Sequence, residues 1–172
     1  MNVTLNTAPI TNAVKAYEVK NPHQTSNAFT ATDEYMAAET LKLRDKEQID
    51  ELKNLVKNFD MTSISSRDLK MLGGMLYRSD IIDFEGYELF MDGNLTANDK
   101  GQRIETHVKF NAIALFNERL EEYSTFLKKH PGDVNKFTLE SRQGMVTANR
   151  ALGALTYLSN SARNGLLVDE KV

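Results

Sequence analysis

The feature that most constrains the fold is a pair of helix starts in the middle of the chain. Ser65 has the properties of an N-cap, and Asp68 follows at the spacing of a capping box. Asp83 is a second N-cap candidate, with the apolar residue Ile82 before it and Tyr87 in the first turn after it. The two starts predict consecutive helices over residues 66–79 and 83–92, which together form an αα-hairpin.

The apolar residues of this hairpin recur at helical spacing. Leu69, Leu72 and Leu76 form one face of the first helix, although Gly73 and Gly74 interrupt it. Glycine inside a helix costs about 1 kcal/mol relative to alanine. We therefore expect the glycines to mark a close approach between helices, with a hinge or the floor of a groove as the alternative.

The hairpin is richer in aromatic and methionine side chains than two short helices require. Such side chains are common at protein-binding surfaces, although a stripe at helical spacing also fits core packing. The candidate partner-binding surface consists of Tyr77, Phe84, Tyr87, Phe90 and Met91.

The rest of the chain also indicates helices. Residues 33–59 carry apolar positions at helical spacing on either side of a charged stretch. Either one long helix spans this range or two helices meet near Asp45. We favour one helix, because neither glycine nor proline interrupts the range.

Two longer helices follow a polar loop. The first begins near Ile104 and Val108 and ends before Pro131, and the second runs from about 138 to 163, with Asn164-Gly165 as its stop. The second is rich in Gly and Ala, so we expect it to be buried and tightly crossed by its neighbours.

The helix that ends before Pro131 has an apolar seam with alternating spacings of three and four. This seam is a candidate for core packing or a dimer interface, and it consists of Ile113, Phe116, Leu120, Tyr123 and Leu127. The outer face of this helix carries Glu118, Arg119, Glu121 and Glu122.

A polar arm precedes these helices. Residues 1–30 are rich in Asn, Thr and Ser and lack apolar periodicity. We expect a flexible or loosely docked arm that is dispensable for folding, followed by one helical domain over residues 31–168. The arm's composition also resembles the uncleaved signals of bacterial type III and flagellar export systems. The fold class that follows is all-α, a single-domain bundle of about five helices behind a loosely ordered arm.

Several kinds of chemistry are disfavoured. The 172-residue chain has no cysteine, and its three histidines are scattered. It shows no Glu-x-x-His pair, no nucleophile elbow and no phosphate-binding glycine loop. The acidic residues around Gly86 fail as a calcium loop, because Ile81 stands at the first ligand position. We therefore expect no enzymatic activity, no cofactor and no metal.

Charge disfavours two partner classes. The net charge is −3, and the second hairpin helix carries carboxylates but neither Lys nor Arg, so we expect no nucleic-acid or membrane binding. No apolar run is long enough to cross a membrane, and no cleavable leader is visible. We expect a cytoplasmic protein, or one exported by a route that needs no signal peptide.

These observations favour a non-enzymatic bacterial protein that binds another protein or a second copy of itself. A component, chaperone or substrate of a type III or flagellar export system is the first alternative. A small-molecule binder with a pocket between helices is the second.

Overall fold

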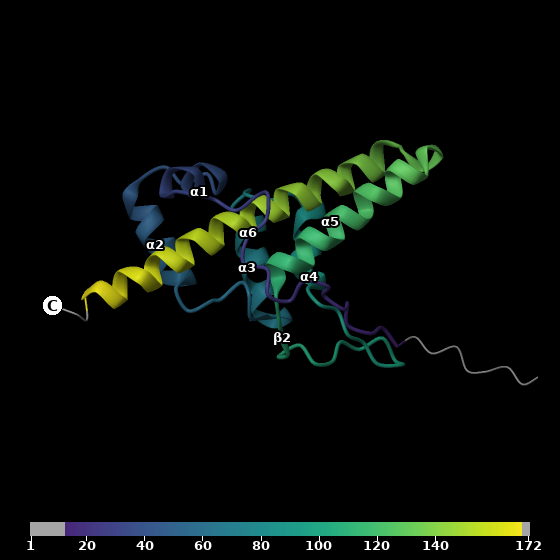
Figure 1. The fold of residues 1–172 in the computed structure, drawn as a ribbon, viewed down its shortest axis with the longest axis horizontal. Coiled ribbons are helices and arrows are strands. Elements are labelled where there is room, and N and C mark those ends of the chain that lie inside the picture. Colours follow the sequence, from purple (N-terminus) through teal and green to yellow (C-terminus); the bar gives the residue numbers. More distant parts are fainter. Residues whose placement is uncertain (1–12, 170–172) are drawn as a thin grey trace, which may run out of the picture.

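The computed structural model describes residues 13–169 and is almost entirely helical (Figure 1). The all-α class is confirmed, with six α-helices in the described range. Residues 1–12, on which part of the export-signal interpretation depends, lie outside this range. The helices are α1 (Glu34–Thr40), α2 (Lys46–Val56), α3 (Ser66–Arg78), α4 (Phe84–Asp92), α5 (Ala112–Lys129) and α6 (Lys136–Asp169).

The long helix α6 forms the axis of the molecule. One half of it packs along α5, and the other half packs against α1 and α2 (Figure 1). The hairpin of α3 and α4 lies against the middle, where α4 contacts α6. A short 3-10 turn, Pro131–Asp133, joins α5 to α6.

The αα-hairpin forms as its caps predict. The Ser65 hydroxyl accepts a hydrogen bond from the Asp68 N–H at 3.2 Å, and Asp83 Oδ1 accepts one from the Gly86 N–H at 2.8 Å. Each cap satisfies an N–H group that the first helical turn leaves without an intrahelical partner.

The prediction of one long helix over 33–59 is wrong. Helix α1 ends at Thr40, and Lys42 adopts the left-handed region with φ of +54°. Asp45 then caps α2 by accepting a hydrogen bond from the Gln48 N–H at 2.9 Å. The helix is interrupted at a lysine in the left-handed conformation, so the absence of Gly and Pro from residues 33–59 does not make the helix continuous.

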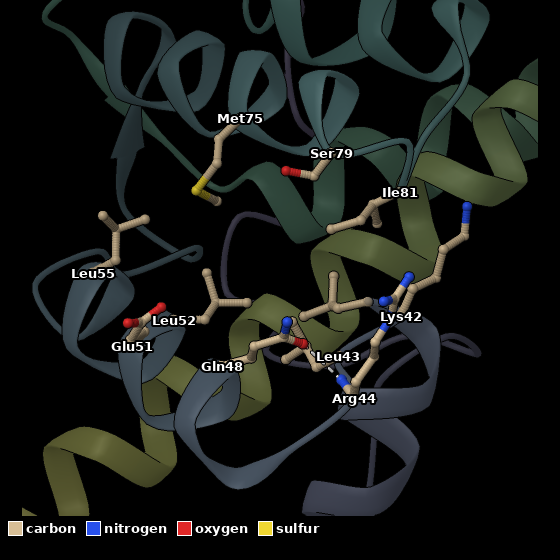
Figure 2. A pocket seen from close by; sticks show the side chains of 11 residues that line it. Lys42, Leu43, Arg44, Gln48, Glu51, Leu52, Leu55, Met75, Ser79 and Ile81 are labelled. Carbon is tan, nitrogen blue, oxygen red and sulfur yellow. Dashed lines mark hydrogen bonds between the residues drawn. The ribbon is translucent and has the colours of Figure 1, made fainter.

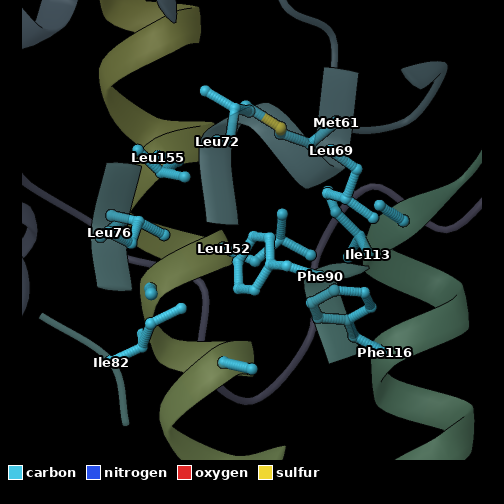
Figure 3. Packing of buried hydrophobic residues seen from close by; sticks show 14 of the residues in the cluster. Met61, Leu69, Leu72, Leu76, Ile82, Phe90, Ile113, Phe116, Leu152 and Leu155 are labelled. Atoms are coloured by element: carbon cyan, nitrogen blue, oxygen red, sulfur yellow. The ribbon is translucent and has the colours of Figure 1, made fainter. Parts of the chain in front are cut away.

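The core lies where α3, α4, α5 and α6 meet (Figure 3). The Phe90 and Phe116 rings pack edge to face, with centroids 5.0 Å apart. A Cβ atom added at Gly73 would lie 2.2 Å from the Phe90 Cβ, and one added at Gly144 would lie 2.4 Å from the Glu85 Cβ. These glycines allow α3 and α6 to approach α4 closely, as their sequence positions predict.

Three further features of the structure differ from those expected from the sequence. Helix α5 begins only at Ala112, where Asn111 is its cap, so Ile104 and Val108 belong to the preceding loop. The two-residue strands β1 (Ile64–Ser65) and β2 (Lys109–Phe110) pair antiparallel, a small addition to the all-α class that the sequence predicts. Helix α6 continues through the Asn164-Gly165 pair to Asp169.

Residues 13–30 contain no helix, and several of them make hydrogen bonds to the helical part of the chain. The Asn111 amide donates hydrogen bonds to the carbonyls of Pro22 and Gln24, at 2.9 and 2.6 Å. The Glu118 carboxylate accepts hydrogen bonds from the Lys20 and Asn21 N–H groups, at 3.0 and 2.9 Å. Glu118 is only 4% exposed, so its assignment to the outer face of α5 is wrong. It is buried because it satisfies the backbone of the arm.

Candidate functional site

The hairpin aromatic residues occupy two different environments. Tyr77 and Phe84 are 41% and 52% exposed, and Tyr77 stacks on the half-buried Tyr87 with ring centroids 5.1 Å apart. Phe90 is fully buried in the core and cannot be part of a partner-binding surface; Met91 is half-buried. The candidate surface is therefore reduced to a small aromatic cluster on one side of the hairpin.

The α5 seam packs within the chain. Ile113, Phe116, Leu120 and Leu127 are buried, and Tyr123 is half-buried. Helix α5 packs along α6 (Figure 1), and Phe116 of the seam packs on Phe90 of α4. Packing inside one molecule is therefore sufficient to account for the burial of these side chains.

A hollow with a volume of about 560 Å³ lies between α2 and α3 (Figure 2). We call it the α2–α3 groove. None of the residues named as candidates from the sequence lines it. Its lining consists of Leu41, Lys42, Leu43, Arg44, Gln48, Glu51, Leu52, Leu55, Met75, Ser79 and Ile81.

One end of the groove is built by two helix C-termini of the same design. At the end of α1, the Leu43 N–H donates to the Ala38 carbonyl at 2.9 Å. At the end of α3, the Ile81 N–H donates to the Leu76 carbonyl at 3.0 Å. Both are Schellman motifs, in which the residue two positions past the last helical turn folds back on the helix. This geometry places the apolar side chains of Leu43 and Ile81 at the groove.

Aliphatic side chains from the two helices form its walls. Leu52 and Leu55 extend from α2 toward Met75 of α3 (Figure 2). Leu55 is 49% exposed, and Met71, one turn before Met75 on the same side of α3, is 52% exposed. The apolar strip therefore continues beyond the hollow itself.

The rim of the groove is polar and has charges of opposite sign at its two ends. Lys42 and Arg44 lie at the end formed by the α1–α2 connection, and Glu51 lies toward the other end, beside Leu55 (Figure 2). The Lys42 ammonium donates a hydrogen bond to the Asp80 carbonyl. This bond fixes the cation at the mouth of the groove.

The geometry offers little to catalysis or metal binding. Across residues 13–169, no three His, Asp or Glu side chains are grouped to hold a metal ion. The α2–β1–α3 unit has the helix–loop–helix layout of a calcium site. If its loop is counted as the twelve residues that end at Asp68, ligand positions one, three and five hold Lys57, Phe59 and Met61. These side chains do not bind calcium.

Buried polar groups are also fully used. Within the described range, no buried side-chain nitrogen or oxygen lacks a hydrogen-bond partner. The rim residues Lys42, Arg44, Gln48, Glu51 and Ser79 are all exposed. The groove therefore combines an apolar interior with a solvated charged edge.

No family model, curated protein or solved structure matches this chain. In the part of the chain that the structure describes, no helix has both the length and the apolarity needed to cross a membrane.

Sequence reasoning missed the groove because its lining comes from three separate segments, residues 41–55, Met75 and 79–81. One local signal was present. Leu52 and Leu55 recur at helical spacing next to a strongly charged stretch. The pattern identifies an apolar face on α2, but it does not show that the facing helix leaves part of that face open.

Proposed function

We propose that this protein is a non-enzymatic binding protein that holds a segment of another protein in the α2–α3 groove. The observation that carries the proposal is the apolar strip of Leu52, Leu55, Met71 and Met75, in which Leu55 and Met71 are exposed and Leu52 and Met75 are half-buried. Covering such side chains is favourable by about 25 cal/mol for each Å² removed from water. Grooves of this kind commonly accept the apolar side of a peptide.

A small apolar molecule is the second candidate, because a hollow of about 560 Å³ falls within the usual range for such ligands. Two observations favour a peptide instead. The apolar strip extends to Met71, past the hollow, and every polar residue of the lining is exposed to solvent rather than enclosed. Small-molecule sites usually place a few polar groups within the pocket to orient the ligand.

The test is a selection of displayed peptides on the full chain, followed by binding measurements with two matched variants. Leu55→Asp places a carboxylate in the groove, and Leu139→Asp places one at a leucine of α6 that is equally exposed, 51% against 49%. We expect Leu55→Asp to weaken binding of the selected peptides at least roughly tenfold, because it buries a charge in an apolar contact. Leu139→Asp should bind them like the wild type.

Two results would contradict the proposal. In the first, both variants lose binding equally, or neither does, so that the peptides bind elsewhere. In the second, no peptide is selected, while a fluorescent long-chain fatty acid binds the wild type and is lost in Leu55→Asp. That second outcome would establish the small-molecule candidate.

A further inference from the structure

We propose that the occupant of the α2–α3 groove is an amphipathic helix that lies antiparallel to α2, with its C-terminal end at Lys42 and Arg44 and its N-terminal end toward Glu51. This inference rests on the proposed function and adds the partner's secondary structure, direction and charge pattern.

The groove has apolar side chains along its length, bordered by Gln48 and Ser79, and charged residues at its ends. Leu52, Leu55 and Met75 line the interior, whereas Arg44 and Glu51 mark opposite ends (Figure 2). A helix presents apolar side chains along one side at spacings of three and four residues. An amphipathic helix can therefore place several apolar side chains in one straight groove between two others.

The end charges are available to a partner. Neither the Arg44 guanidinium nor the Glu51 carboxylate makes a hydrogen bond or ion pair with another residue of the described range. The Lys42 ammonium has three N–H donors, and its bond to the Asp80 carbonyl uses one of them. The cation end can therefore receive a carboxylate without losing a bond that the fold already uses.

These charges select a direction. A helix carries a partial negative charge at its C-terminus and a partial positive charge at its N-terminus. The cations lie just before the first residue of α2, and Glu51 is on the second turn of α2. A partner helix that runs antiparallel to α2 therefore meets a charge of opposite sign at each end. A carboxylate in its last turn and a cation in its first turn would reinforce this arrangement.

The experiment uses two dye-labelled amphipathic peptides of identical composition, which share a leucine face with spacings of three and four. The forward peptide has Lys in the first turn and Glu in the last, and the reverse peptide has these charges exchanged. Each is titrated by fluorescence anisotropy against the wild-type chain and a charge-exchanged variant, Arg44→Glu with Glu51→Arg. Both substituted residues are exposed, and circular dichroism verifies that the variant is folded.

The quantity compared is the ratio of the two dissociation constants, reverse over forward, in each protein. The intrinsic helicity of each peptide cancels when the wild-type ratio is divided by the variant ratio, as in a double-mutant cycle. We expect this quotient to be at least roughly tenfold at low salt and to fall as salt is added.

Three outcomes would overturn the inference. A quotient near one, with both peptides released by Leu55→Asp, means that the groove binds peptides without reading direction; the proposed function then stands and the inference fails. If neither the forward nor the reverse peptide binds the wild type, the occupant is not an amphipathic helix. Concentration-dependent self-association of the wild type that Leu55→Asp abolishes, observed by light scattering, would make the occupant a second copy of this chain.

Discussion

Lys42 and Asp80 occupy equivalent positions at the ends of two helices and are joined to each other. Each is the first residue past a helix C-cap, each has φ of +54°, and the Lys42 ammonium donates a hydrogen bond to the Asp80 carbonyl. The pair ties the end of α1 to the end of α3 at the mouth of the α2–α3 groove. The left-handed conformation costs about 1–2 kcal/mol for a residue with a Cβ atom.

Asp80→Gly tests this backbone strain. Glycine adopts the left-handed region freely, and the main-chain carbonyl that accepts from Lys42 is retained. After subtraction of the greater freedom of glycine in the unfolded chain, we expect a gain of about 0.5–1 kcal/mol in the free energy of unfolding by urea titration. Asp80→Ala is the control and should be less stable than Asp80→Gly. Equal stability of the two variants would contradict strain at this position.

Gly73 and Gly74 are adjacent, yet alanine should have opposite effects at the two positions. A Cβ atom at Gly73 would lie 2.2 Å from the Phe90 Cβ, whereas one at Gly74 would lie 3.9 Å from the Tyr87 hydroxyl. Gly73→Ala should therefore destabilise by about 3 kcal/mol or more through overpacking. Gly74→Ala should stabilise by up to about 1 kcal/mol through helix propensity. Thermal unfolding of both variants decides, and a stable Gly73→Ala would show that α3 and α4 can separate without cost.

The features that the sequence predicts well are those set by neighbouring residues. The caps at Ser65 and Asp83 form because each side chain reaches an N–H group three residues away. The close approach at Gly73 was also accessible, because a glycine inside an apolar helical face commonly marks a point where a second helix packs closely.

The features that the sequence predicts poorly depend on contacts between residues far apart in the chain. The break at Lys42 has no glycine to signal it, and the left-handed residue is held by its bond to Asp80 and by the packing of Leu43. Phe84 and Phe90 are both aromatic residues at helical spacing in α4, but only Phe90 is buried, where its ring packs on Phe116 of α5. The α2–α3 groove requires knowing which apolar faces remain uncovered, and that is determined by the whole fold.

The N-terminal segment contributes to stability through Glu118. Its carboxylate accepts the Lys20 and Asn21 N–H groups, so Glu118→Ala should leave both donors without this partner. We expect a loss of about 2–3 kcal/mol in urea titrations. Glu121→Ala, at an exposed position of the same helix, should remain within about 0.5 kcal/mol of the wild type. A neutral Glu118→Ala would instead support the expectation that the arm is dispensable for folding.

Glu122 should give the folded protein a dependence on acidic pH. Hydrogen bonds from Lys20 and Tyr17 hold the pKa of this carboxyl below its ordinary value of 4.5. A lowered pKa in the folded state gives stability that is present above the ordinary value and is lost as pH falls through the folded-state value. The stability difference between wild type and Glu122→Gln should therefore shrink when pH falls below about 4.5. A difference that stays constant from neutral to acidic pH would contradict this linkage.

Leu120 decides whether the α5 seam belongs to the core of one molecule. Its side chain is buried by contacts within the chain, so Leu120→Ala should cost about 2–5 kcal/mol through lost packing and the cavity left behind. Tyr123→Phe, at the half-buried position of the seam, removes only the hydroxyl group and should cost much less. Neither the wild type nor Leu120→Ala should change its thermal midpoint with protein concentration. Two results together would show that the seam is a dimer interface. The midpoint would rise with protein concentration, as mass action requires for an oligomer, and Leu120→Asp would yield a smaller particle by light scattering.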